Sequence, residues 1–361
     1  MMSAVRNWIE SYLGRGEAAP TVPTMDGALH PNTALDDCEA VLGIAAPDNL
    51  LVRGDDLWFT SGADLFRLLP GAREPELIHS YEVAVSCLAG AGDLLAIGTE
   101  DGDIHLSHDG SVPTGTALAT MTCPVAMTFS PSRGLLVCDG STDHAPQQWK
   151  RDLMSHGSSG RVVGVDLETG RETAIAGNLR YPFGIVEMDK GDLVISEAWA
   201  ARLVRLREGP AQTVLSDLPG YPSRLTVAQG GGYWLTVLAP RSQLVELVLR
   251  QGPYRKRMME EVEEQFWVAP TLCAATSYLE PLQGGAIRTH GIIKPWAPTR
   301  SYGLLVRLND AFQPIDSWHS RADGTRHGLT SCAEWDSVPH VSSKGGNELL
   351  RVSESGNGVV Q

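Results

Sequence analysis

The sequence predicts an all-β fold, a six-bladed β-propeller with a short N-terminal helix and a helical insertion over one face. A unit of apolar strand, tight polar turn and second apolar strand recurs six times along the chain. The shorter spacings between copies are 37 to 40 residues, the length of one four-stranded propeller blade. The 38 glycines and 22 prolines among 361 residues are also typical of turn-rich β structure.

The six copies supply the strands that are expected to line the centre of the propeller. They cover residues 48–62, 85–102, 125–140, 183–200, 223–240 and 328–343. Most copies are followed by a further apolar strand, and either the strand before the first copy or the tail after Glu348 is expected to complete the last blade. Each small sheet has two apolar faces, and radial stacking buries both of them. The alternative, a pair of β-sandwiches, does not explain six similar units.

The remaining segments are an N-terminal segment before the propeller and two insertions within it. Residues 1–32 are read as a short amphipathic helix at 5–14 followed by a Pro-rich connector, and residues 33–361 as the propeller. The insertions are 141–160 and 241–300. Within the second, apolar residues near helical spacing in 253–267 predict a helix packed over one face of the propeller, with a substrate lid as the alternative.

Charge and composition exclude several classes of function. The net charge of −14 argues against nucleic-acid binding, because an acidic chain repels phosphate backbones. No apolar run is long enough for a membrane span, and the N-terminus has no apolar core of a secretory signal. A cytoplasmic protein with six reduced cysteines is expected, and a Cys123–Cys138 bridge has no support beyond the residues themselves. The oligomeric state stays open.

Three segments carry a resemblance to a known family. Residues 160–206, 218–249 and 327–337 resemble the strictosidine-synthase-like proteins, which belong to a wider group that includes gluconolactonase and paraoxonase. The likeness covers roughly residues 45–352 and is specific over 160–250. It implies a six-bladed propeller with a small-molecule pocket at one end of the central channel.

The resemblance also implies where a metal would be bound, and this sequence departs from that pattern. Hydrolytic members of the group hold calcium with side chains at the starts of the innermost strands. The matching positions here are Asp48, Val125, Phe183 and Ser223, followed by Arg224. Calcium takes six to eight oxygen ligands, so this set predicts a site without metal and a protein without cofactor.

The acid–base residue of strictosidine synthase is not carried over either. That glutamate aligns with Thr330, and Glu334 matches a neighbouring family glutamate instead. Both catalytic signatures of the group are therefore altered in this chain.

Metal-free chemistry needs a proton donor or acceptor in a dry pocket, and two residues are candidates. Asp48 is expected to face the channel, where burial beside Phe183 and Val125 would raise its pKa and Arg224 would oppose that rise. His327 precedes the last inner strand and is the second catalytic candidate. Capping a turn and a structural role are the respective alternatives.

Other residues are candidates for contacts with a substrate. Arg224 could orient an anionic group. Core packing or a structural hydrogen bond is the alternative for most of the others, which are Phe183, Ser223, Val125, Glu197, Trp199, His290, Thr330 and Tyr302.

Three hypotheses about function follow. The first is an enzyme that acts on a small organic molecule in the channel by metal-independent acid–base chemistry, as a hydrolase or lyase on a C–O, C–N or C–C bond. The second is a calcium-dependent lactonase or esterase of the gluconolactonase type. The third is a propeller that binds a small molecule without catalysis.

Overall fold

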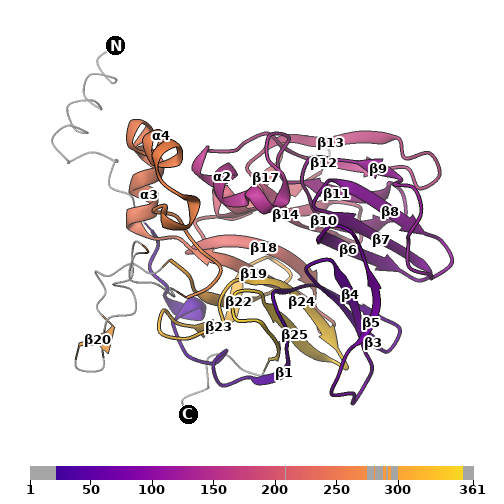
Figure 1. Cartoon of the computed structure of the whole chain (residues 1–361), viewed down its shortest axis with the longest axis horizontal. Coiled ribbons are helices and arrows are strands. Elements are labelled where there is room, and N and C mark those ends of the chain that lie inside the picture. The colour runs from indigo at the N-terminus through magenta and orange to yellow at the C-terminus, as the bar shows by residue number, and fades with distance from the viewer. Residues whose placement is uncertain are drawn as a thin grey trace.

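The strands form a closed ring of six blades (Figure 1). The computed structural model describes residues 22–207, 209–274, 280, 288–289, 292–293 and 300–352. Each of the six large sheets has four strands, and the innermost strands contact one another in sequence around the ring, with the last contacting the first. The predicted six-bladed propeller is confirmed.

Blades 1 to 3 are continuous in the sequence. Blade 1 contains β2 (Pro47–Arg53), β3 (Asp56–Ser61), β4 (Asp64–Leu68) and β5 (Glu76–Ser80). Blade 2 contains β6 (Val85–Ala91), β7 (Leu94–Thr99), β8 (Asp103–Ser107) and β9 (Ala119–Thr120). Blade 3 contains β10 (Pro124–Ser130), β11 (Gly134–Asp139), β12 (Gly160–Val165) and β13 (Glu172–Leu179).

Blades 4 to 6 include the long insertion and the closure of the ring. Blade 4 contains β14 (Pro182–Glu187), β15 (Leu193–Glu197), β16 (Arg202–Leu206) and β17 (Gln212–Leu215). Blade 5 contains β18 (Gly220–Val227), β19 (Tyr233–Pro240), β22 (Gly303–Leu308) and β23 (Pro314–Ser320). Blade 6 contains β24 (Leu329–Trp335), β25 (Val338–Ser343), β26 (Glu348–Arg351) and β1 (Glu39–Gly43).

The ring is closed by a strand from the N-terminal part of the chain. β1 pairs antiparallel with β26, so the strand that precedes the first repeat completes the last blade. This is one of the two closures that the sequence left open. Blade 6 thus joins strands from both ends of the described chain, with β1 as its outermost strand.

Every inner strand carries a β-bulge near its first residues. The pairing with the second strand of the blade shifts register between Val85 and Cys87 in blade 2, and at the corresponding place in the other five blades. A bulge leaves a residue without a ladder partner and turns its backbone groups out of the sheet. The six bulges therefore surround one end of the central channel.

Short helices from the two insertions lie on one side of the propeller. The first insertion holds η2 (Pro146–Gln148) and α2 (Trp149–Met154), and the second holds α3 (Gln243–Arg250), α4 (Gly252–Glu261) and η4 (Glu264–Phe266). In Figure 1, α3 and α4 lie beside one another, and their buried residues share a core with α2 and with blades 3 and 4.

The predicted helix over 253–267 is correct only for its first part. α4 ends at Glu261, and Val262 has an extended backbone. Trp267 is fully buried, and its indole nitrogen donates to the Val262 carbonyl, so this half of the segment packs as an irregular turn. The predicted N-terminal helix at 5–14 lies outside the described residues.

Two further expectations concern thiols and membranes. All six cysteines are free, and only Cys273 is exposed. Among the described residues, no helix has the length and apolar character needed to cross a membrane.

Candidate functional site

The side chain of Arg224, from blade 5, occupies the centre of the channel and contacts all five of the other blades. Its Nη1 donates to Asp48 Oδ1 of blade 1 at 2.6 Å and to the Thr330 carbonyl of blade 6 at 3.1 Å. Its Nη2 donates to the carbonyls of Ser86 in blade 2 at 2.8 Å and Val125 in blade 3 at 2.9 Å. The guanidinium carbon lies 5.3 Å from the ring centroid of Phe183 in blade 4.

The bulges explain why these carbonyls are available. Ser86, Val125 and Thr330 are the residues that the register shifts leave unpaired in β6, β10 and β24. An unpaired backbone carbonyl buried away from water is costly, so each needs a donor from elsewhere. The planar guanidinium supplies donors to all three.

Asp48 is held as a carboxylate by two cations. Oδ1 accepts from Arg224 and from the Asn49 amide at 2.8 Å, and Oδ2 accepts from Lys344 Nζ at 2.9 Å. Burial alone would raise the pKa of Asp48, but Arg224 and Lys344 together outweigh it and hold that pKa well below its ordinary value. Both expected influences on this pKa, burial and Arg224, are present, and Lys344 adds a second lowering influence that was not predicted.

A small pocket opens on this end of the channel. Its volume is about 50 Å³. Five of its lining residues were named from the sequence, namely Asp48, Val125, Phe183, Arg224 and Thr330. The others are Ser86, Glu100, Pro146, Trp149, Tyr181, Leu238, Leu272 and Lys344.

Sequence reasoning missed the two charged residues of this pocket, Glu100 and Lys344. Glu100 directly follows β7, and Lys344 directly follows β25. Because the second strand of each blade runs antiparallel to the first, its last residue lies at the same end of the channel as the start of the inner strand. That rule applied to the predicted repeats would have found both residues.

Glu100 differs from Asp48 in its electrostatic surroundings. Burial raises the pKa of the Glu100 carboxyl, Lys344 opposes this and Asp48 adds to it. The pocket thus contains a fixed carboxylate at Asp48 and, at Glu100, a carboxyl whose proton is easier to keep. Two carboxyls with pKa values moved in opposite directions are the usual basis for separate roles in acid–base chemistry.

His327, the second catalytic candidate, is not among the residues that line this pocket. Its side chain is fully buried, with Nδ1 2.8 Å from Ser301 Oγ and Nε2 2.8 Å from the Arg321 carbonyl oxygen. Burial lowers the pKa of His327, so the neutral ring is favoured. Both ring nitrogens have partners in the fold, which gives this histidine a structural position.

Glu197, Trp199 and Tyr302 are also placed in packing positions away from the pocket. Glu197 accepts from the Arg180 amide and from Arg202. The Trp199 indole donates to Asp152 and stacks on the ring of Tyr181, with 4.4 Å between ring centroids.

The Tyr302 hydroxyl lies 3.1 Å from His319 Nδ1. His290 lies outside the described residues.

Ser223 and Thr330 connect blades through their polar groups. The Ser223 hydroxyl is fully buried, donates to the Leu329 carbonyl and lies 2.8 Å from Thr236 Oγ1. The Thr330 hydroxyl lies 3.1 Å from Ser342 Oγ, while its carbonyl accepts from Arg224. Ser223 is therefore not among the residues that line the pocket. Thr330 does line it, and its carbonyl oxygen is already bonded to Arg224.

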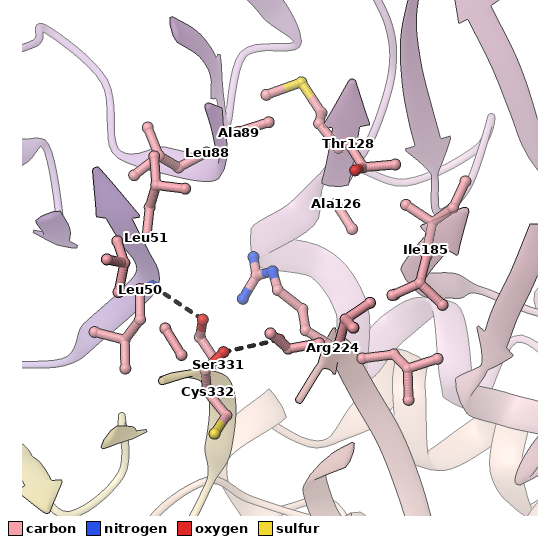
Figure 2. Close-up of a pocket in the computed structure, with 18 of the residues that line it drawn as sticks. Leu50, Leu51, Leu88, Ala89, Ala126, Thr128, Ile185, Arg224, Ser331 and Cys332 are labelled. Atoms are coloured by element: carbon pink, nitrogen blue, oxygen red, sulfur yellow. Dashed lines mark hydrogen bonds between the residues drawn. The ribbon is translucent and has the colours of Figure 1, made fainter. Parts of the chain in front are cut away.

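A second and larger pocket lies on the other side of Arg224. It has a volume of about 330 Å³ and is lined mostly by aliphatic side chains from the later part of the inner strands. Figure 2 shows Arg224 reaching into the centre of this ring of strands, among Leu50, Leu51, Leu88 and Ala126. Arg224 lines both pockets and so separates the two ends of the channel.

The hub does not fit a calcium ion. Of the four positions at which the resemblance implies ligands, Val125 and Phe183 carry no side-chain oxygen and Ser223 is bonded elsewhere. The carboxylate and three carbonyls that converge at the centre all accept from one guanidinium. Within the described part of the chain, no group of three or more His, Cys, Asp or Glu residues could hold a metal.

The structural comparisons define the class of protein. The chain resembles regucalcin, a calcium-binding protein from Agrobacterium tumefaciens, with a TM-score of 0.55, 11% identity, and coverage of 88% of this chain and 94% of that one. It also resembles a gluconolactonase from Xanthomonas campestris, with a TM-score of 0.54, 12% identity, and coverage of 92% and 96%. These likenesses establish a six-bladed propeller with gluconolactonase-type structural neighbours.

The curated relatives add similarities in sequence to these likenesses in fold. The chain is 29% identical to the zebrafish (Danio rerio) adipocyte plasma membrane-associated protein over 138 residues, 34% of this chain and 33% of the relative. For the chicken (Gallus gallus) protein of that name, the values are 23% over 315 residues, 68% and 71%. For Arabidopsis thaliana strictosidine synthase-like protein 13, they are 30% over 107 residues, 28% and 26%.

The chain is thus similar in sequence to strictosidine synthase-like and adipocyte plasma membrane-associated proteins. It spans about a third of the length of the first curated relatives that it matches. No family model matches it.

Proposed function

We propose that this propeller is an enzyme that performs metal-independent acid–base chemistry on a small organic molecule at the Asp48 end of the channel. The observation that carries the proposal is that one aromatic-walled pocket contains both the Glu100 carboxyl and the ammonium group of Lys344, which Asp48 holds in place. A carboxyl that moves a proton and a cation that stabilises developing negative charge can serve either hydrolysis or a lyase reaction. Hydrolysis of a small ester or lactone is the first reaction to test, since a structural neighbour is a gluconolactonase.

Each residue has a distinct role in this proposal. Glu100 takes the proton from an attacking water and returns it to the leaving alcohol, because its raised pKa suits both steps. Lys344 donates to the carbonyl oxygen as negative charge develops there. Asp48 stays ionised and orients Lys344, and Trp149, Tyr181 and Phe183 bind the apolar part of the substrate.

The proposed hydrolysis is complete with water and Glu100 and needs no metal ion. Water oxygen bonds to the carbonyl carbon as Glu100 accepts a proton, and the C–O bond to the leaving group breaks as Glu100 gives that proton back. His327 has no part in this scheme, because it does not line the pocket.

The test is an assay of small lactones and aryl esters in the presence of a chelator. Replacing Glu100 with Gln is expected to lower kcat/KM by about 100-fold or more, the usual contribution of a general base. Glu334→Gln is the matched control, because Glu334 lines the opposite pocket and is bonded to Trp234 and to the Gln229 amide. Equal activity in the two variants would contradict the proposal. Activity that disappears with chelator and returns with calcium would support the calcium-dependent lactonase instead.

The loss of both catalytic signatures of the group favours a second candidate function, a propeller that binds a small molecule without converting it. Val125 and Phe183 stand at positions where the resemblance implies metal ligands, and Thr330 stands where it implies the acid–base glutamate. Compounds from the same panel that stabilise the protein saturably and are recovered unaltered would support this candidate.

A further inference from the structure

Within the described structure, Arg224 takes a position at the hub that is shaped like a binding site for a free cation. Its guanidinium is bonded to one carboxylate and three backbone carbonyls from blades 1, 2, 3 and 6. It also lies against the Phe183 ring of blade 4. The arginine itself comes from blade 5. One side chain thus connects all six blades at the axis.

The chemistry of the surrounding groups selects a guanidinium. Each terminal nitrogen makes two hydrogen bonds, at 2.6 and 3.1 Å for Nη1 and at 2.8 and 2.9 Å for Nη2. Two hydrogen bonds from each of two terminal nitrogens match the fork of N–H donors that a guanidinium offers, and the aromatic ring of Phe183 suits its flat face. A Lys ammonium has three donors and no plane.

The bulges make this arrangement part of the fold. Three of the four acceptors are carbonyls that the inner strands leave unpaired. Without a cation at the axis, these carbonyls and Asp48 would face one another with only Lys344, at the edge of the group, to offset their negative potential.

We propose that Arg224 is a tethered internal cation, bound in a guanidinium site that the six blades form together, and that it replaces a metal ion in organising the hub. The chemical class of ligand for this site is therefore a guanidinium, which a truncated variant would accept from solution. This inference concerns the stability of the fold and does not depend on the proposed enzymatic activity.

The experiment measures thermal unfolding of Arg224→Ala with added guanidinium or methylguanidinium chloride at low millimolar concentration, against sodium chloride of equal ionic strength. The variant is expected to unfold roughly 5 °C or more below the wild type, because it leaves a buried carboxylate and carbonyls without their donor. Free guanidinium is expected to restore most of that loss saturably. Absence of rescue in a folded variant would overturn the proposal.

Arg307→Ala is the matched control. Arg307 also donates to several backbone carbonyls and stacks on an aromatic ring, Trp234, but it lies on β22, away from the hub. Its loss is expected to destabilise the protein without rescue, and rescue equal to that of Arg224→Ala would show a nonspecific salt effect and overturn the proposal.

If Arg224→Ala does not fold, the wild type and Arg224→Lys decide the question. The wild type is expected to keep the same melting temperature in chelator and in calcium, and Arg224→Lys to unfold at a lower temperature than the wild type. A wild type that loses stability in chelator and regains it with calcium would overturn the proposal.

Discussion

The two ends of the central channel are lined by the same six inner strands, yet they differ in charge and size. The end where the strands begin has a pocket of about 50 Å³ with Asp48, Glu100, Arg224 and Lys344 in its wall. The other end has a pocket of about 330 Å³ with mostly aliphatic walls, and its carboxylate Glu334 is bonded to Trp234 and to a backbone amide.

The difference shows that the charged groups of this channel gather at the end with the smaller of the two pockets. The bulges at the strand starts turn unpaired carbonyls into the channel, and those carbonyls require hydrogen-bond donors, which the Arg224 guanidinium supplies. The strand ends lack this requirement, so aliphatic residues are sufficient there. The position of the bulges therefore determines where the charged groups collect.

The largest effect on stability is expected from Asp48→Asn. The change leaves Arg224 and Lys344 without their shared counter-charge, and loss of one partner of a buried ion pair costs about 3–5 kcal/mol. The pKa of Asp48 is lowered in the folded protein. The stability that its ionised carboxylate contributes is therefore fully present above the ordinary pKa of 3.8 and is lost progressively as the pH falls from there toward the lower pKa of the folded state. Denaturant unfolding of both proteins at pH 7 and near pH 3 measures this, and a difference that does not shrink at the lower pH would contradict it.

A pH profile of activity tests the role of Glu100. Because its pKa is raised above the ordinary value of 4.5 and the base must be ionised, kcat/KM is expected to fall as the pH is lowered through a value above 4.5. In Glu100→Asp the midpoint of this fall is expected to move, while Glu334→Asp leaves it in place. A profile that is flat down to pH 4.5 would exclude Glu100 as the base.

Lys344→Met is expected to separate stability from activity. The Lys344 side chain is 32% exposed, so solvent screening limits the stability loss to about 1 kcal/mol. Activity is expected to fall by about 10-fold or more, because the substrate oxygen loses its donor. Denaturant unfolding and kcat/KM measured on one preparation test both parts. If the loss of activity in Lys344→Met is fully explained by the smaller fraction of folded protein, Lys344 has no role in the mechanism.

The smallest effect is expected at the opposite end, from Thr226→Val. The Thr226 hydroxyl donates to the Cys332 carbonyl at 2.8 Å, and its loss costs about 1 kcal/mol. Activity is expected to stay within about twofold of the wild type, because a substitution at a separate site acts independently. A large loss of activity, measured in the same assay, would mean that the two ends of the channel are coupled.

The sequence predicted most of the fold because strand alternation and repeat spacing are local signals. All six inner strands and the alternative closure by the strand before the first repeat agree with the structure. The segment 253–267 was predicted less well, because apolar spacing does not distinguish helical packing from the turn that buries Trp267.

The site was only partly predictable, because local signals locate the strand starts but do not show which residues of different blades meet. Asp48, Arg224 and Phe183 were found because they occupy the starts of inner strands, which the resemblance identified. Glu100 and Lys344 come from the ends of second strands, and their proximity to Asp48 depends on how blades 1, 2 and 6 are arranged in space. The stabilisation of the Asp48 carboxylate likewise depends on Lys344, 296 positions away in the chain, as well as on Arg224.

The claim that a guanidinium, and no metal ion, centres this propeller is tested most directly by calorimetric titration of calcium into the chelator-treated wild-type protein. No binding heat is expected up to about 1 mM calcium, the weak limit for protein calcium sites. Stoichiometric binding at micromolar calcium would contradict the account.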